Sequence, residues 1–228
     1  MNEVYFISDA HLGIESPGKE GRKKNALLSF LKEVASKGSG LYILGDLYDF
    51  WFEYRRGVSV LDSRIAEALS SLASKGIDVT YVGGNHDYWL GSYWEERGIR
   101  ISREPITVNI QGKTVLMAHG DGLGGADPAY LMVKWLLRNK ISIGIYSQLG
   151  RPIGNGLALM VSKLSRAKSN RTVPRMTEGL LRYAMTKFKE GCDIVICGHI
   201  HNPTLVREND RIFCLLGDWM EHFTYGRM

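Results

Sequence analysis

The sequence predicts a layered α/β domain, and three observations lead to that fold class. Short apolar runs rich in Val, Ile, Leu and Tyr recur along the chain, and each ends in polar or glycine-containing residues, as buried strands do. Amphipathic segments of helical period separate several of these runs. The chain has 228 residues, of which 44% are hydrophobic and 23% charged. We therefore expect residues 1–228 to form one domain of ordinary globular composition.

Six apolar runs are predicted to be strands: Val4–Ser8, Leu41–Leu44, Val79–Val82, Val115–Ala118, Ile194–Cys197 and Ile212–Leu216. A hairpin is predicted from Thr107–Ile110 and Lys113–Ala118, which only Gln111 and Gly112 separate. Asn25–Ser36 and Leu61–Ser74 place apolar residues at positions i, i+3, i+4 and i+7, so we expect both to be amphipathic helices.

Residues 128–189 interrupt this alternation, because they contain no clear strand. Four helices are predicted there: Ala129–Arg138, Ser142–Leu149, Gly156–Ser165 and Thr177–Lys189. The segment holds 12 Lys and Arg residues and one acidic residue, a net charge of +11, whereas the rest of the chain holds 17 basic and 23 acidic residues, or −6. We interpret it as a basic helical insertion facing an anionic partner, and nucleic acid, acidic phospholipid and a phosphorylated small molecule all fit.

Composition also bears on where the protein works. No run of about 18 apolar residues is present, so we expect no membrane span. The N-terminus reaches Glu3 and Asp9 at once, so we expect no signal peptide. Three cysteines, Cys192, Cys197 and Cys214, lie in apolar runs, and this small odd number favours buried core residues over a disulfide framework. A reducing, cytoplasmic location is the expectation.

Five of the six histidines directly follow predicted strands. The chain carries five short motifs at these strand ends: SDAHLG (8–13), GDLYD (45–49), GGNHD (83–87), AHGD (118–121) and GHIHNP (198–203). A single histidine is more often a packed structural residue. Five histidines beside Gly, Asp or Asn at strand ends are better explained as a cluster of ligands.

The residue types in these motifs fit divalent transition metals, since Asp and His together bind Mn, Fe or Zn. Asp9 and His11 are two residues apart, as are His199 and His201, and on extended backbone such side chains point the same way. The carboxylate of Asp46 can bridge two ions. Two ions about 3.5–4 Å apart would hold a phosphoryl group for in-line attack by hydroxide. The motifs contain no thiol, so a Cys-rich structural zinc site is not expected.

In their order and composition, the five motifs resemble the calcineurin-like metallophosphoesterase superfamily. The resemblance implies a two-sheet β-sandwich flanked by helices, with a helical cap insertion, and a centre of two divalent metals, Mn being favoured and Fe or Zn the alternatives. One metal would be held by Asp9, His11, Asp46 and His201. The other would be held by Asp46, Asn85, His119 and His199. His86 matches the histidine that contacts the substrate phosphate and assists the leaving group. Asp49 and Asp87 would orient the ligands.

Nearly the whole chain also resembles UDP-2,3-diacylglucosamine hydrolases. The resemblance rests on the first two motifs, on Leu216–Trp219, on His119–Gly122 and on Ser165–Ser169. It implies that a metal-bound hydroxide splits the pyrophosphate into UMP and 2,3-diacylglucosamine 1-phosphate, while the cap houses the acyl chains. The implied substrate contacts are Asn85, His86, Asp127, Tyr130, Arg166 and Ser169.

The insertion combines positive charge with apolar stripes, and a phosphorylated glycolipid requires both. Such helices can also lie on an anionic membrane, so we expect a peripheral position on the inner face of the cell membrane. Nucleic acid is not the expected partner, because few aromatic residues are placed for base stacking.

One residue differs from the pattern of these hydrolases, and this difference keeps an alternative function open. Many of these hydrolases have Arg where this chain has His86, and GNHD is the form of the wider superfamily. The alternative is therefore a metallophosphoesterase acting on nucleotides, cyclic nucleotides or nucleic acid phosphodiesters. A binding scaffold that has lost the chemistry is a third hypothesis, and the full ligand set argues against it.

Overall fold

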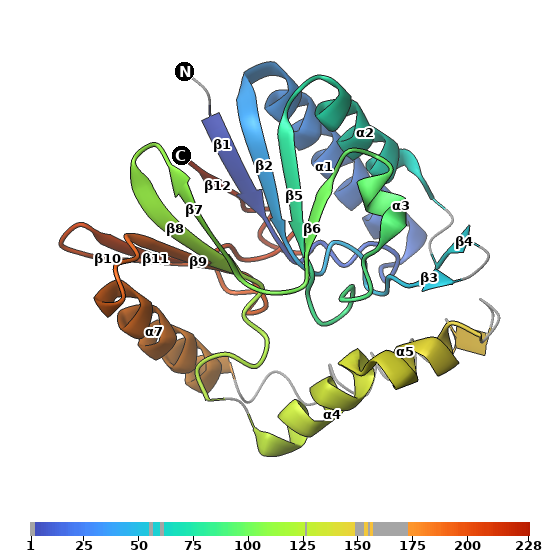
Figure 1. The fold of residues 1–228 in the computed structure, drawn as a ribbon. Helices are drawn as coiled ribbons and strands as arrows, with labels where there is room; N and C mark the ends of the chain where they lie inside the picture. The colour runs from blue at the N-terminus through green and yellow to red at the C-terminus, as the bar shows by residue number, and fades with distance from the viewer. Residues whose placement is uncertain are drawn as a thin grey trace.

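Two five-stranded sheets pack face to face, and helices cover both outer faces (Figure 1). This is the arrangement in a computed structural model that describes residues 3–54, 57–59, 62–125, 127–148, 153–154, 156 and 173–228. The two-sheet sandwich flanked by helices is thus confirmed, as is the α/β class.

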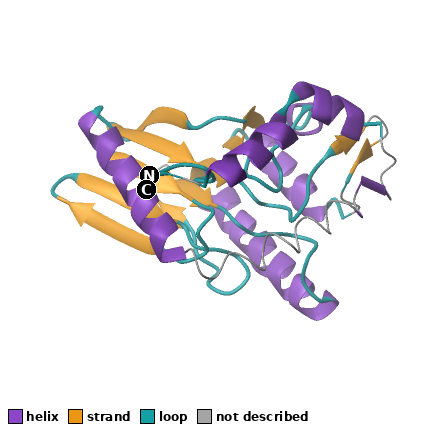
Figure 2. Ribbon diagram, turned by 90° about the horizontal axis from the view of Figure 1, so that it is seen from below, coloured by secondary structure: helices purple, strands orange, loops and turns teal. Residues whose placement is uncertain are grey.

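The first sheet has the order β12-β1-β2-β5-β6. Its strands are β1 (Glu3–Ile7), β2 (Gly38–Leu44), β5 (Asp78–Val82), β6 (Arg100–Ser102) and β12 (Gly226–Arg227). All but β12 run parallel, and β12 lies antiparallel beside β1, so the first and last strands are neighbours (Figures 1 and 2). The outer face carries α1 (Pro17–Lys37), α2 (Arg64–Ser74) and the short α3 (Ser92–Glu95).

The second sheet has the order β10-β11-β9-β8-β7. Its strands are β7 (Ile106–Ile110), β8 (Lys113–Ala118), β9 (Ile194–Cys197), β10 (Thr204–Glu208) and β11 (Arg211–Leu215). The central three are parallel, and the edge strands β7 and β10 are antiparallel to their neighbours. Helix α7 (Val173–Lys189) covers its outer face. A small ribbon of β3 (Glu53–Tyr54) and β4 (Gly57–Val58) stands apart.

The alternation of side chains along each strand divides the core into layers. In β1, Tyr5 and Ile7 pack under α1 and α2, whereas Phe6 points into the space between the sheets. In β9, Ile194 and Ile196 face that same space, whereas Val195 and Cys197 pack against Leu180 and Ala184 of α7. Because the residues follow a period of two, both faces of each central strand are buried.

Helices α4 (Pro128–Arg138) and α5 (Lys140–Tyr146) differ from the others, since neither has a buried residue. They lie beneath the sandwich in Figure 1, whereas α7 buries Gly179, Leu180 and Ala184 and belongs to the helical layer of the second sheet. That residues 128–189 act together as one cap stays a prediction. In the part of the chain that the structure describes, no helix is long and apolar enough to cross a bilayer.

The predicted strands are all present. Ile194–Cys197 has the bounds of β9, and the other predicted ranges differ from the observed strands by at most three residues at either end. Helix α1 begins at Pro17, well before the predicted Asn25, because its first turns bury the polar side chains of Glu20 and Lys23. Helix α7 begins at Val173 instead of Thr177, and α5 ends at Tyr146. The exposed edge strand β10 and the short strands β6 and β12 were not predicted. Most of the predicted helix at 156–165 lies outside the described residues.

Candidate metal centre

Loops that follow strands of both sheets meet at one edge of the sandwich and bring most of the predicted ligands together. Four of these ligands have a left-handed backbone: Asp9 (φ 55°), His11 (φ 42°), Asp46 (φ 54°) and His199 (φ 69°). Residues other than glycine adopt this conformation at a cost, and such strain concentrates at functional sites. The sharp turns aim the side chains inward across the ends of the strands.

Glycines let the loops approach one another closely. A Cβ atom at Gly84 would lie 2.1 Å from Oδ1 of Asp46, and one at Gly198 would lie 2.6 Å from Oδ2 of Asp9. Any larger residue at these two positions would displace a carboxylate, so the glycines of the motifs have a steric role in forming the centre.

The first group of ligands is Asp9, His11 and His201, and their ligand atoms all lie within 4.8 Å of one another. Oδ2 of Asp9 accepts the backbone N–H of His199 at 2.8 Å, whereas the buried Oδ1 has no hydrogen-bond partner among the described residues. Oδ1 lies 3.4 Å from Nε2 of His201 and 3.8 Å from Nε2 of His11. The free carboxylate oxygen therefore faces two imidazole nitrogens.

The second group is Asp46, His119 and His199. Nε2 of His119 lies 3.3 Å from Oδ2 of Asp46 and 3.0 Å from Oδ1 of Asn85. Nε2 of His11 is 3.7 Å from the same Asp46 oxygen. Asp46 therefore stands between the two groups, where a bridging carboxylate was predicted.

The histidine tautomers indicate a cation. Nδ1 of His119 lies 2.8 Å from the carbonyl oxygen of Leu44, and Nδ1 of His11 lies 3.2 Å from Oδ1 of Asp49. Each oxygen takes the Nδ1 proton, so in the neutral ring Nε2 keeps its lone pair. Nε2 of His11 then faces Nε2 of His201, 3.2 Å away, and Nε2 of His119 faces the amide oxygen of Asn85, 3.0 Å away. Lone pairs aimed at one another in this way fit divalent metal ions.

His86 lies beside both groups. Its Nδ1 donates to the main-chain carbonyl of Asp49 at 2.8 Å, and its Nε2 points at Oδ2 of Asp46, 4.0 Å away. The backbone N–H of His86 donates to the other Asp46 oxygen at 2.9 Å. With His11 and Asp46 it forms a third group of suitable ligand spacing, so the geometry permits both phosphate contact and metal ligation by His86.

Asp87 joins two of the loops. Its Oδ2 accepts the backbone N–H of Leu47 at 2.8 Å and the hydroxyl of Tyr81, and its Oδ1 accepts the N–H of Gly84 at 2.7 Å. Burial and the neighbouring charge of Asp46 raise the pKa of Asp87. Asp87 therefore holds two of the motif loops together, and Asp49 lies behind His11. That the two residues orient metal ligands stays a prediction.

The charges within the centre balance one another. Burial works to lower the pKa of His11 and His119, but the surrounding carboxylates outweigh it and raise both to about 10. Burial works in the opposite direction on Asp46, and the positive histidines, His119 first, hold its pKa well below the usual range. Burial and the charge of His119 lower the pKa of His199 to about 4. Without metal, protons on histidine therefore supply the positive charge that the carboxylates require.

The predicted substrate contacts are placed differently. Asp127 is exposed and caps α4, accepting the N–H of Ala129 at 2.9 Å. The hydroxyl of Tyr130 lies 3.2 Å from Oδ2 of Asp121. Arg166 and Ser169 lie outside the described residues. Contact of these four with substrate stays a prediction.

Three residues to which the sequence analysis gave no role connect α4 to the centre. The buried carboxylate of Asp121 pairs with Lys134 at 2.8 Å and with Arg138 at 2.9 Å. Arg138 also donates to the carbonyl of Gly84 at 3.3 Å. A signal was present in the sequence, because Tyr130, Lys134 and Arg138 recur every four residues and so share one face of the helix.

Known proteins similar to this chain cover almost all of it. Residues 3–203 match the family model described as calcineurin-like phosphoesterase. A UDP-2,3-diacylglucosamine hydrolase from Porphyromonas gingivalis is 29% identical, over 99% of this chain and 93% of the relative. Proteins of the same name from Pseudomonas paraeruginosa and Hahella chejuensis are each 32% identical, over 95% and 97% of this chain and 90% and 91% of the relatives.

Proposed function

The chain belongs to the calcineurin-like phosphoesterase family and is therefore a metal-dependent hydrolase, and we propose that its substrate is UDP-2,3-diacylglucosamine. The products are UMP and 2,3-diacylglucosamine 1-phosphate. The observation that carries this proposal is the near-complete coverage by hydrolases of that name, which extends through α4 and α5. A glycolipid substrate requires an apolar surface for its acyl chains, which a small phosphodiester does not, and α4 and α5 offer such a surface.

The surface of α4 and α5 supports a substrate with acyl chains. Large apolar side chains are exposed along these helices: Leu131, Met132, Val133, Trp135, Leu136, Leu137, Ile141 and Ile145. Monomeric proteins seldom leave so many contiguous apolar residues in water without a binding role. Lys134 and Arg138 stand on the same helix beside the metal centre. Apolar surface and cations therefore occur together, as a phosphorylated diacyl lipid requires.

We propose two divalent ions, manganese in preference to iron or zinc. Asp9, His11, Asp46 and His201 would hold one of them. Asp46, Asn85, His119 and His199 would hold the other. When bound, the ions polarise phosphoryl oxygens and make a coordinated water acidic enough to supply hydroxide near neutral pH. The mixed nitrogen and oxygen ligands suit all three metals.

The protein's own groups position the phosphate and the departing oxygen. Donation from Nε2 of His86 to a phosphate oxygen requires the doubly protonated ring, because the carbonyl of Asp49 already takes the Nδ1 proton. The carboxylates of Asp46 and Asp49, at 4.0 and 3.7 Å, would pair with that imidazolium. His86 would then donate to the scissile phosphate or to the leaving oxygen.

We also propose that the protein lies on the inner face of the cell membrane through α4 and α5. Their apolar residues would enter the interface, and the exposed Lys140 would meet anionic headgroups. Flotation with phosphatidylglycerol vesicles tests this. Ile141→Glu with Ile145→Glu should abolish flotation, whereas Leu205→Glu on the exposed edge strand β10 should not. Equal flotation of all variants would contradict the proposal.

Phosphorus NMR of the manganese-loaded protein with UDP-2,3-diacylglucosamine in oxygen-18 water tests the reaction. We expect release of UMP, with the label in UMP, because attack occurs at the phosphorus of the nucleotide. Asp46→Asn should abolish turnover. If the protein cleaved bis-para-nitrophenyl phosphate but left the glycolipid intact, the metal centre would stand and the substrate would be wrong. His86, where many of these hydrolases have Arg, is the observation that favours that second candidate.

A further inference from the structure

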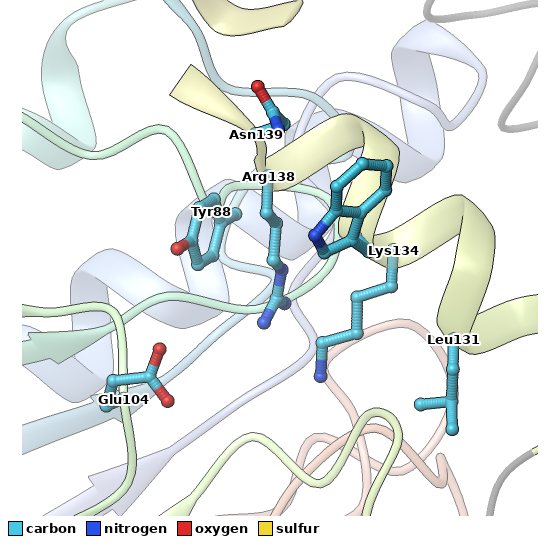
Figure 3. Close-up of a pocket in the computed structure, with 7 residues that line it drawn as sticks. Tyr88, Glu104, Leu131, Lys134, Arg138 and Asn139 are labelled. Carbon is cyan, nitrogen blue, oxygen red and sulfur yellow. The ribbon is translucent and has the colours of Figure 1, made fainter. Parts of the chain in front are cut away.

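A cavity of about 380 Å³ lies beside the metal centre, between α4 and the loop that carries His86. In Figure 3, Lys134 and Arg138 reach into it from the helix, Tyr88 lies beside Arg138, and Glu104 lies across from them. Trp135 and Asn139 complete the polar and aromatic lining. Neither the ligand groups nor their supporting residues line this cavity.

The cavity and the metal centre share a wall. Tyr88 comes two residues after His86, and the guanidinium of Arg138 lies 4.0 Å from the centre of its ring. The same guanidinium donates to the carbonyl of Gly84 at 3.3 Å, next to the predicted ligand Asn85. The indole of Trp89 donates to the carbonyl of Leu137 at 3.2 Å and so fixes the end of α4. A substrate with phosphorus at the metals can therefore extend one end into the cavity.

The lining fits an acyl chain poorly. Four of its seven residues carry a charge or an amide, and an alkyl chain could make no hydrogen bond to any of them. The volume lies near the lower end of the range for small-molecule sites, about 300–1,000 Å³. The cavity therefore fits one polar moiety of modest size.

Each lining group matches a part of a ribonucleoside. Trp135 is 66% exposed and offers a face on which a base can stack. A carboxylate only accepts hydrogen bonds, so that of Glu104 can take both hydroxyl protons of a ribose. The amide oxygen of Asn139 accepts the N–H of Ile141 at 2.8 Å, and its NH₂ group can donate to a carbonyl of the base. Lys134 and Arg138 share one carboxylate, Asp121, so one positive charge is left over for phosphate.

We propose that this cavity binds the ribonucleoside half of the substrate, with the base on Trp135 and the ribose hydroxyls at Glu104. The assignment rests on the proposed function, because a uridine is part of UDP-2,3-diacylglucosamine. The assignment of the cavity and the proposed function can be tested separately, since UMP alone is a sufficient probe of the cavity.

The test compares inhibition by UMP and by inorganic phosphate, with bis-para-nitrophenyl phosphate as the reporter substrate of the manganese-loaded protein. UMP should inhibit the wild-type protein more strongly than phosphate does. Glu104→Gln and Trp135→Ala should each weaken inhibition by UMP about tenfold, because the first loses a hydrogen bond to a charged group and the second a stacking contact. Neither variant should weaken inhibition by phosphate. The controls Glu96→Gln, on an exposed acid, and Leu205→Ala, on an exposed apolar residue, should behave as wild type.

Two outcomes would overturn the proposal. In the first, UMP inhibits the wild-type protein no more strongly than phosphate does. In the second, UMP inhibits the wild-type protein and both cavity variants equally. Neither depends on hydrolysis of the glycolipid, which the NMR experiment decides independently. Thermal melting of each variant separates loss of binding from loss of folding, and these side chains are exposed enough for the fold to tolerate the changes.

Discussion

The ammonium group of Lys23 donates a hydrogen bond to the main-chain carbonyl of His11, 2.7 Å away. Lys23 is only 1% exposed, and its ion partner is Glu20, at 3.4 Å on the same face of α1. Glu20 in turn accepts the backbone N–H of Gly13 at 2.9 Å. One turn of α1 therefore holds the loop after β1 on both sides of His11, where the backbone is left-handed.

Replacing this lysine should weaken the fold and the metal centre together. Lys23→Met keeps the alkyl stem but leaves the His11 carbonyl without its donor, so we expect the free energy of unfolding to fall by about 2–3 kcal/mol. Urea denaturation measures this, and manganese titration should show weaker binding. Lys19→Met, on an exposed part of the same helix, should change stability by less than about 0.5 kcal/mol. Equal effects of the two variants would show that the buried contact does not position the loop.

Gly84→Ala tests the close approach of the loops. The new Cβ would lie 2.1 Å from Oδ1 of Asp46 and 2.7 Å from its backbone nitrogen, so the carboxylate must move. We expect the variant to lose bound manganese, measured by elemental analysis after dialysis, and to lose hydrolysis of bis-para-nitrophenyl phosphate. The control is Gly21→Ala in α1, where nothing lies within 4 Å. That change should stabilise the protein by about 0.5–1 kcal/mol. Full metal content in the Gly84 variant would contradict the steric argument.

The central strands and the convergence of the metal ligands could be predicted because both follow from adjacent residues. An apolar run forms a buried strand, its motif follows at once, and parallel strands bring their carboxyl ends to one edge. The beginning of α1 could not be predicted in this way, because its first turns bury Glu20 and Lys23. Apolar periodicity does not detect a buried face made of an ion pair.

The position of α4 was predictable only in part. The spacing of Tyr130, Lys134 and Arg138 indicates a common helix face, but their shared partner, Asp121, comes from the loop after β8. Which carboxylate meets that face depends on the tertiary fold. The cavity at Tyr88 and Glu104 was missed for the same reason, since its lining comes from three separate parts of the chain.

Asp121→Asn should loosen α4 from the sandwich. The buried carboxylate accepts from Tyr130 at 3.2 Å, Lys134 at 2.8 Å and Arg138 at 2.9 Å, and an amide would leave both cations without their counter-charge. Hydrogen exchange over 128–138 should therefore be about tenfold faster, whereas exchange in α1 should not change. The control is Asp127→Asn, because Asn caps a helix as well as Asp does. Unchanged exchange in the Asp121 variant would mean that other contacts hold α4.

Asp218→Asn should destabilise the protein at neutral pH and less so in acid. Oδ1 of Asp218 accepts the N–H groups of Met220, Glu221 and His222 at 3.0, 2.8 and 3.0 Å. Burial works to raise the pKa of Asp218, but these hydrogen bonds outweigh it and lower the pKa. The stability they contribute is therefore complete above the unfolded value of about 3.9 and lost as pH falls through the folded pKa. We expect a loss of about 1–3 kcal/mol by urea denaturation at pH 7, and a smaller difference from wild type as the pH falls below that unfolded value. Asp210→Asn, at an exposed turn, provides the control, and a pH-independent difference for Asp218→Asn would contradict the role of the charge.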